Sequence, residues 1–180
     1  MALKKNYKNK YVAKLPIEGA RRSELLMPAG SLEKLKFAVL YGADAVYMGT
    51  PDMCMRVKSK FTLEEVIEGV QFCHDHGARA YLTLNLIAHN RDLEKLPEYI
   101  EAIRTVKPDG VIIADPGVFN FVRQHAPELS LHVSTQANVT NWMTVKYWQD
   151  QGADLVVMAR DVSFEELAEV REKCPDIMIE

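Results

Sequence analysis

From about residue 24 onward the chain alternates amphipathic runs with short apolar runs, and one such unit occurs twice in the sequence. YGADAVYMGT at 41–50 and QGADLVVMAR at 151–160 share the pattern Gly-Ala-Asp-x-Val-x-Met, and HGARAYLTLN at 76–85 is a looser third copy. Gly42 and Gly152 stand where a helix would end, because glycine accepts the left-handed conformation there. Asp44 and Asp154 fit the turn before a strand. A unit of helix, glycine turn and strand indicates a βα array with a parallel sheet.

The same alternation predicts the elements of the whole chain. We expect strands at 24–29, 45–48, 79–87, 111–114, 131–135, 155–159 and 177–179. Helices are expected at 31–40, 62–77, 92–106, after Pro116, at 139–151, and from Ser163 to before Pro175, with Ser31, Thr62 and Ser163 as N-caps. Six βα units and the start of a seventh strand fall short of the eight units of a closed barrel. No Gly-rich dinucleotide fingerprint follows the first strand. The sequence therefore predicts an α/β fold, a partial (β/α)₈ TIM-type barrel over 23–180, rather than a doubly wound sheet.

Composition places the chain among ordinary globular proteins. It has 180 residues, of which 48% are hydrophobic and 26% are charged. No apolar run approaches the roughly 20 residues that span a bilayer, and no signal-peptide stretch is present. The chain has three cysteines, Cys54, Cys73 and Cys174. Their number is odd and no two of them have CxxC spacing, which indicates free thiols in a reducing compartment. We expect a cytoplasmic protein with no membrane partner.

Charge is distributed unevenly along the chain. Residues 1–22 contain seven lysines and arginines against one glutamate, a charge of +6, which leaves −9 for the rest of a chain whose net charge is −3. The first interpretation is a flexible, solvated leader over 1–22. The second is a segment that contacts nucleic acid through phosphate charge and stacking of Tyr7 and Tyr11. The acidic remainder argues against a wide phosphate-binding face.

Two predicted strands carry a polar face, although both sides of a barrel strand are usually apolar. At 79–87 leucines alternate with Tyr81, Thr83 and Asn85, and at 131–135 Leu131 and Val133 alternate with polar residues that continue to Gln136. The leucine faces are expected to pack on helices, so the polar faces point into the lumen. Unpaired buried polar groups are costly, which favours a ligand pocket. The alternative is a polar plug whose groups satisfy one another.

More polar residues gather where the predicted strands end, and barrel enzymes place their sites at that end. The candidate ligand-binding residues are Asn85, His89, Asp115, Ser134, Gln136, Asn138 and Arg160. Arg160 suits a carboxylate or phosphate, because guanidinium pairs with both through two hydrogen bonds. Its alternative role is a structural ion pair with Asp161 or Asp115. Arg56 is a weaker candidate for anion binding.

Other reactive patterns are less informative. FCHDHG at 72–77 offers cysteine, histidine and aspartate, but adjacent helical positions point in different directions and do not converge on one metal. No G-x-S-x-G or H-E-x-x-H motif is present. Ser134, His132 and Asp115 could be drawn as a triad, but nothing in the sequence fixes its geometry. We assign no catalytic residue and expect no metal site in this chain.

Four longer motifs resemble the collagenase-like peptidase family U32. They are ELLMPAGSLEKLKFAVLYGADAVYMG, NLIAHN, ADPG and STQANVTNWMTVKYWQDQGADLVVMARDVSFEEL, and the resemblance covers roughly residues 24–180. Within the family, MRVKSKFT and QANVTNWMTVKYW look most like a branch that helps convert the wobble uridine of some tRNAs to 5-hydroxyuridine, with prephenate implicated in the pathway. Sister branches act on ribosomal RNA and on ubiquinone precursors. The peptidase name reflects reported collagen degradation.

The resemblance also implies features that lie beyond these residues. In the family a strand led by glutamate runs into a signature of several cysteines, which hold an iron–sulfur cluster in several branches. IMIE matches the approach to that signature, with Glu180 as its leading residue, and none of the three cysteines matches a cluster position. We therefore expect this chain to be the N-terminal barrel portion of an RNA-modifying enzyme. An iron–sulfur cluster is expected only in the full-length protein. The expected partner is tRNA, and prephenate is expected as a substrate or ligand. The alternatives are a metal-independent peptidase and a non-catalytic binding fragment. Open barrel edges would favour self-association.

Overall fold

Seven strands and seven α-helices make up the computed structural model, which describes residues 23–50 and 61–180. The strands are β1 (Leu26–Ala29), β2 (Ala45–Gly49), β3 (Arg79–Leu84), β4 (Gly110–Ile113), β5 (Ser130–Val133), β6 (Leu155–Val156) and β7 (Met178–Ile179). The helices are α2 (Leu32–Leu40), α3 (Leu63–Asp75), α4 (Asn90–Leu93), α5 (Leu96–Val106), α6 (Pro116–His125), α7 (Trp142–Asp150) and α8 (Phe164–Lys173), with one 3-10 turn, η1 (Thr135–Ala137).

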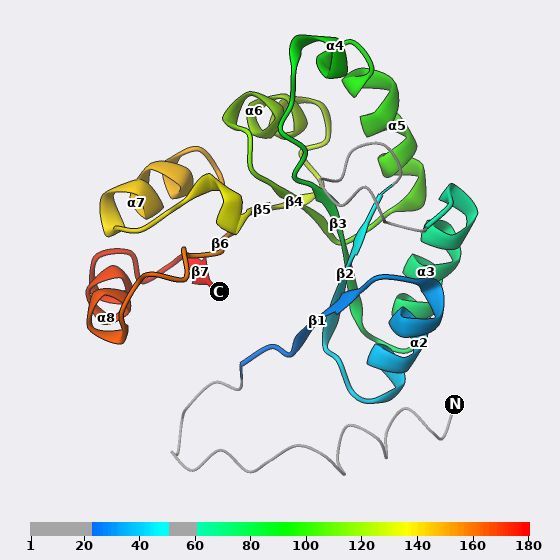
Figure 1. The fold of residues 1–180 in the computed structure, drawn as a ribbon, viewed down its shortest axis with the longest axis horizontal. Helices are drawn as coiled ribbons and strands as arrows, with labels where there is room; N and C mark the ends of the chain where they lie inside the picture. Colours follow the sequence, from blue (N-terminus) through cyan, green and yellow to red (C-terminus); the bar gives the residue numbers. More distant parts are fainter. Residues whose placement is uncertain (1–22, 51–60) are drawn as a thin grey trace.

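The strands form one sheet in the order β1 to β7, and every neighbouring pair is parallel. The sheet curls so that the helices lie outside it, with α2 and α3 beside β1 to β3 and with α7 and α8 beside β6 and β7 (Figure 1). A curled, sequentially ordered parallel sheet with alternating helices is the TIM-type arrangement. The predicted fold class is confirmed, including six βα units and the start of a seventh strand.

The repeated Gly-Ala-Asp unit joins neighbouring strands at the amino ends of the sheet. Gly42 and Gly152 adopt φ of 102° and 92°, the left-handed region that favours glycine. The carboxylate of Asp44 accepts the backbone N–H of Leu25 at 3.0 Å, and that of Asp154 accepts the N–H of Leu131 at 3.0 Å. The repeat is therefore scaffold: each glycine reverses the chain and each aspartate connects the start of one strand to the strand before it.

The apolar residues separate into two groups. Leu82 and Leu84 of β3 and Leu131 and Val133 of β5 belong to the large cluster between the sheet and the helices. This is the side that the leucine alternation predicts. A smaller cluster of Ala45, Tyr81 and Ile112, with Leu26 and Tyr47 packed against it, fills the concave side. The lower lumen is thus packed, and any pocket must lie above it.

Several predicted boundaries are wrong at the carboxyl ends of the strands. β3 ends at Leu84 instead of residue 87, and β6 ends at Val156 instead of residue 159. After β5 the chain turns at once into η1, because the Ser134 side chain accepts the N–H of Gln136 at 3.3 Å. The single helix predicted for 92–106 is two helices, since α5 begins anew at Leu96 with a proline in its first turn.

The helix caps agree with the sequence. Thr62 and Ser163 each form a capping box with the glutamate three residues later, and Ser31 caps α2. Asn141 caps α7, so that helix begins later than the predicted residue 139. No helix among residues 23–50 and 61–180 has the length and apolar character of a membrane span. The basic leader at 1–22, Cys54 and Arg56 lie outside the described residues.

Candidate functional site

A cavity of about 770 Å³ opens at the carboxyl ends of the strands, on the concave side of the sheet. Its walls come from the β1–α2 connection, from β2 and β3, from the turn after β5, and from the segment after β6. The lining residues are Leu26, Pro28, Ala29, Gly30, Ser31, Lys34, Tyr47, Gly49, Thr83, Asn85, Ile112, Ser134, Thr135, Gln136, Val157, Met158, Arg160 and Glu180. We call this cavity the mouth pocket.

Hydroxyl groups in and beside the mouth pocket connect the strand ends. Thr50 Oγ1 donates to the Thr83 carbonyl at 3.1 Å, and Thr83 Oγ1 donates to the Met48 carbonyl at 3.3 Å. Thr135 Oγ1 donates to the Met158 carbonyl at 3.2 Å. These hydroxyls satisfy backbone carbonyls of neighbouring segments, so this part of the wall matches the self-satisfied alternative. It gives the pocket a rigid frame.

Asn85 differs from these hydroxyls. It follows the last residue of β3 and lines the mouth pocket. Its side-chain oxygen is buried and has no hydrogen-bond partner among the described residues. A buried amide without a partner costs about 1–3 kcal/mol, so its presence favours a ligand that supplies the missing donor.

A second polar group lies one layer lower on β5. His132 is only 2% exposed and its Nε2 lies 3.2 Å from Ser130 Oγ, which donates its own proton to Asp154 at 2.8 Å. Nε2 must therefore carry a proton, and Nδ1 is left as a buried acceptor without a partner among the described residues. Burial lowers the pKa of His132 to about 4, against the opposing attraction of Asp154, so the ring is neutral at neutral pH.

The aromatic ring of Tyr81 lies beside His132, with ring centroids 4.5 Å apart, and burial raises the pKa of the Tyr81 phenol. The hydrogen bond of His132 goes to Ser130 and not to Ser134. Asp115 uses its carboxylate as the N-cap of α6, where Oδ1 accepts the N–H of Val118 at 2.9 Å. The serine–histidine–aspartate triad that could be drawn from the sequence is therefore not assembled.

Two basic side chains and one acidic side chain line the mouth pocket. Arg160 and Lys34 are exposed, and neither makes an ion pair within the part of the chain that the structure describes. The alternative role of Arg160 as a structural partner of Asp115 or Asp161 is thus not observed there. Burial raises the pKa of the Glu180 carboxyl. The two cations leave the pocket suited to an anionic group.

The structure brings four of the seven candidate residues to the mouth pocket: Asn85, Ser134, Gln136 and Arg160. The other three do not line it. Asp115 caps a helix, His89 begins α4, and Asn138 ends η1 in the left-handed conformation with φ of 52°. Sequence reasoning missed Lys34, Tyr47 and Glu180. The signal available for Tyr47 was its alternation with Val46 and Met48 in β2.

The side chains of the FCHDHG segment make separate contacts. Cys73 is fully buried, and burial raises the pKa of its thiol to about 12. His74 Nε2 lies 3.0 Å from an Asp109 carboxylate oxygen, and His76 Nδ1 lies 2.8 Å from the Phe72 carbonyl oxygen. The side chains have separate partners, and no group of three metal-binding residues occurs among the described residues.

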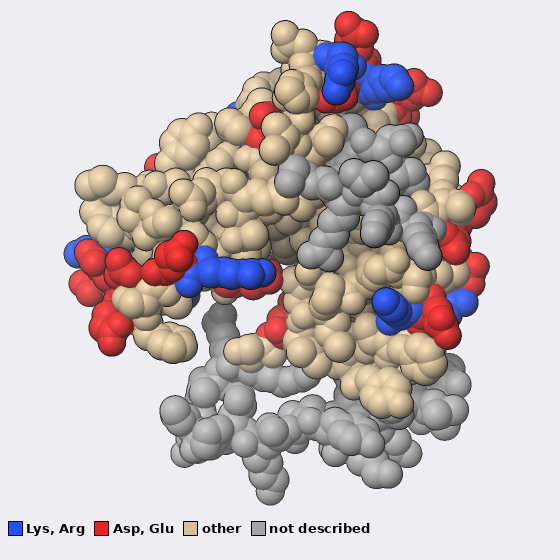
Figure 2. Space-filling model, in the orientation of Figure 1, with Lys and Arg blue, Asp and Glu red and all other residues tan. Residues whose placement is uncertain are grey.

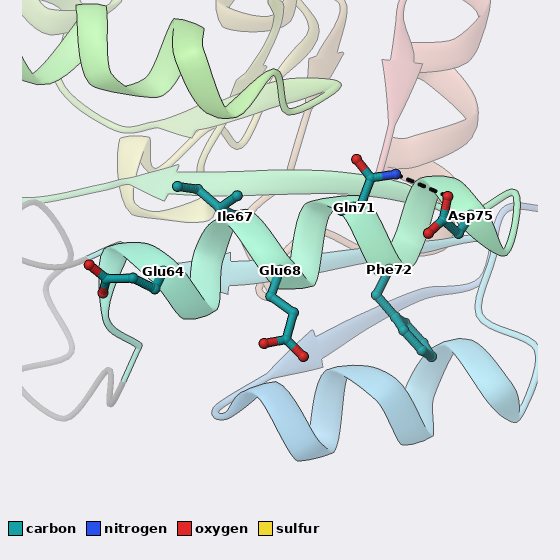
Figure 3. Close-up of a pocket in the computed structure, with 6 residues that line it drawn as sticks. All are labelled: Glu64, Ile67, Glu68, Gln71, Phe72 and Asp75. Carbon is teal, nitrogen blue, oxygen red and sulfur yellow. Dashed lines mark hydrogen bonds between the residues drawn. The ribbon is translucent and has the colours of Figure 1, made fainter.

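A second hollow, of about 470 Å³, lies along the outer face of α3. Its lining residues are Glu64, Ile67, Glu68, Gln71, Phe72 and Asp75 (Figure 3). Phe72 points toward α2, where Lys36 lies over its ring at 5.6 Å and pairs with Glu68 at 2.6 Å. Gln71 donates to Asp75 at 3.0 Å. Four of the six lining side chains therefore already have partners, and the hollow is a weaker candidate than the mouth pocket.

Charged side chains of both signs are interspersed around the edge of the face in Figure 2, and its centre is mostly uncharged. No broad surface of lysine and arginine appears on this face of the described residues. The charge pattern agrees with the acidic balance of residues 23–180.

Comparison with known proteins places this geometry in context. Residues 30–180 match the model of Peptidase family U32. The tRNA hydroxylation protein P1 of Bacillus subtilis is 44% identical over 161 residues, 89% of this chain and 38% of that protein. The 23S rRNA 5-hydroxycytidine C2501 synthase of Escherichia coli is 31% identical over 153 residues, 85% of this chain and 23% of that protein. The solved structure of the U32 peptidase Mk0906 superposes with a TM-score of 0.74 at 17% identity, covering 94% of this chain and 72% of that one.

Proposed function

The chain belongs to Peptidase family U32, and we propose that it forms the barrel portion of an RNA-modifying hydroxylation protein whose ligand site is the mouth pocket. The similarity to a tRNA hydroxylation protein over 89% of this chain is the observation that carries the proposal. The chain spans 38% of the length of that relative, so the activity is proposed for the protein as its gene encodes it.

The proposed RNA target is the wobble uridine of tRNA, which would be converted to 5-hydroxyuridine. The resemblance of the turn after β5 and of α7 to the tRNA-hydroxylation branch supports tRNA over ribosomal RNA. The related 5-hydroxycytidine synthase acts on a pyrimidine as well, according to its name. Because the proposed substrate is tRNA, we also propose a cytoplasmic location.

Within the mouth pocket, Arg160 and Lys34 would hold an anionic group, and Ser134, Gln136 and Asn85 would orient the polar remainder of the ligand. The anion is either a phosphate of RNA or a carboxylate of a small ligand such as prephenate. Titration with RNA and with prephenate, each at several salt concentrations, distinguishes the two, since phosphate contacts give a steep salt dependence.

An iron–sulfur cluster, implied by several family branches, does not fit the cysteines that the structure describes. Cys73 is buried with a raised thiol pKa, and Cys174 is buried with its sulfur 3.6 Å from the Trp142 carbonyl oxygen. These two residues lie on α3 and at the end of α8, on different parts of the helix layer. We therefore assign no role in a cluster to either residue.

Self-association through the sheet edges is also part of the proposal. β1 and β7 each pair with one described strand, so each has one edge without a partner among the described residues. Free edges of this kind pair readily with strands of another chain. Sedimentation of the 180-residue chain should show concentration-dependent association, and a stable monomer at high concentration would contradict it.

Deletion of the gene tests the central proposal. Nucleosides from purified tRNA and ribosomal RNA of the deletion strain are compared by mass spectrometry with those of the parent strain. We expect loss of 5-hydroxyuridine and its derivatives from tRNA, with restoration by the wild-type gene. An unchanged nucleoside profile, combined with gelatin or casein cleavage by the purified protein, would instead support the peptidase alternative. Unchanged nucleosides, together with no cleavage of gelatin or casein, would support the third interpretation, a non-catalytic binding fragment.

A further inference from the structure

We propose that the mouth pocket receives the pyrimidine base of an unstacked RNA nucleotide, and that Asn85 determines specificity by hydrogen-bonding the edge of that base. The inference rests on the proposed function and adds to it the part of the substrate that enters the barrel. Enzymes that act on a base must take it out of the stack, and they then contact its edge and its faces in a pocket. The mouth pocket offers groups for each of these contacts.

The edge of the base is matched by the Asn85 amide. Its oxygen is buried in the pocket wall without a partner among the described residues. A carboxamide presents an acceptor beside donors. Uracil presents the complementary pair, because its N3–H lies beside a carbonyl oxygen. Pairing of the two edges would supply the donor that the Asn85 oxygen lacks and would remove the cost of its burial.

The faces of the base are matched by apolar and aromatic side chains of the same cavity. Tyr47 of β2 is half-buried and lines the pocket, as do Pro28, Ile112 and Met158. An aromatic ring such as that of Tyr47 stacks with a base irrespective of its identity, and the aliphatic side chains add apolar contact area. A volume of about 770 Å³ has room for one nucleoside, so the cavity size agrees with entry of a single nucleotide.

The phosphates on either side of that nucleotide are matched by the two cations. Lys34 extends from α2, which follows β1, and Arg160 follows β6, so they approach the pocket from distant parts of the sheet order. Both are exposed and carry no ion pair among the described residues. Two separated cations suit a backbone that enters the pocket on one side and leaves it on the other.

The test compares two single-stranded pentanucleotides with identical adenosine flanks. One carries a central uridine and the other a central N3-methyluridine, which lacks the N3–H but keeps every phosphate. Wild-type protein should bind the uridine RNA at least about fivefold more tightly, which is the lower end of the discrimination that a paired base edge typically provides. Equal affinity for the two RNAs would overturn the inference and would leave only an anion site.

Asn85→Leu provides the second arm. Leucine keeps the branched shape and approximate size of the side chain but has no acceptor for the N3–H, so this variant should lose most of the discrimination against N3-methyluridine. Asn90→Leu is the matched control, because Asn90 is exposed on α4 and does not line the pocket. Undiminished discrimination by Asn85→Leu, at an unchanged melting temperature, would also overturn the role of Asn85.

Failure of this inference differs from failure of the proposed function. If the proposed function is wrong, deletion of the gene leaves the nucleosides of tRNA and ribosomal RNA unchanged. If only this inference is wrong, deletion still removes the hydroxylated nucleoside, but the wild-type protein binds the two pentanucleotides equally well.

Discussion

Substitution of Asp154 tests why the Gly-Ala-Asp unit is repeated. Its carboxylate accepts the Ser130 hydroxyl at 2.8 Å and the Leu131 N–H at 3.0 Å, at the start of β5. Asp154→Ala removes both hydrogen bonds. A hydrogen bond to a charged group contributes about 1.5–3 kcal/mol, and the exposure of Asp154 favours the lower end of that range. We therefore expect a loss of about 2–4 kcal/mol in the free energy of unfolding.

The assay is urea denaturation followed by circular dichroism, with a thermal scan in parallel. For a chain of this size the melting temperature should fall by roughly 5–15 °C. Asp150→Ala is the control, because Asp150 lies four residues earlier and makes an exposed i,i+4 pair with Lys146 at 2.7 Å. Such pairs contribute about 0.3–0.5 kcal/mol. If the two variants lose equal stability, the carboxylate of Asp154 does not connect the strands in the way described.

Three further predictions concern packing, pH and ligand charge. Gly110→Ala should lower the free energy of unfolding by about 1–3 kcal/mol in urea denaturation, because a Cβ there would lie 2.4 Å from the Ser130 carbonyl oxygen. Gly30→Ala is the control and should change the free energy of unfolding little, because a Cβ there has no atom of the described chain within 4 Å. The pKa of His132 is lowered from 6.5 to about 4, so the unfolded chain binds the proton more readily. The free energy of unfolding should therefore fall by about 3 kcal/mol as the pH drops from about 6.5 to about 4. The same measurement on His132→Gln should show a flatter dependence on pH, because that variant has no imidazole to protonate. Arg160→Ala should leave the melting temperature unchanged and weaken pentanucleotide binding at low salt by roughly fivefold, since an exposed pair is worth about 1 kcal/mol. A clear loss of stability would instead reveal a structural ion pair.

The scaffold is predictable from the sequence because its signals are local. Gly42 and Gly152 mark helix ends by their backbone freedom, and Thr62 with Glu65 marks a helix start by a capping box. The alternation of Leu82 and Leu84 with Tyr81 and Thr83 identifies the two sides of β3 without any knowledge of the partners. Each of these signals is read within a few residues.

The site is less predictable because it depends on contacts between distant segments. Asp115 and Asn85 both follow a barrel strand, yet one caps α6 and the other lines the pocket with a side-chain oxygen that has no partner among the described residues. The residue type does not distinguish these roles. Lys34 belongs to the first turn of a helix, and its access to the pocket follows only from the position of α2 above the sheet.

His132 shows the same limit in the lumen. Its polar alternation with Leu131 and Val133 indicates an inward side chain. Its hydrogen-bond partner, however, is Ser130, which in turn donates to Asp154 on the following βα unit. The protonation state of the ring follows from this chain of hydrogen bonds and from its burial, neither of which can be read from spacing alone.

The most direct test of the account measures hydroxylated uridine in tRNA while the mouth pocket is blocked. Gly30 lines the pocket, and a Cβ added there meets no atom of the described residues within 4 Å. Gly30→Phe should therefore fold normally and occupy the cavity. The deletion strain is supplied with either the wild-type gene or the Gly30→Phe gene at equal protein levels, and tRNA nucleosides are quantified by mass spectrometry. We expect the wild-type gene to restore 5-hydroxyuridine and the Gly30→Phe gene to leave it absent. Full restoration by Gly30→Phe would contradict the assignment of RNA hydroxylation to this pocket.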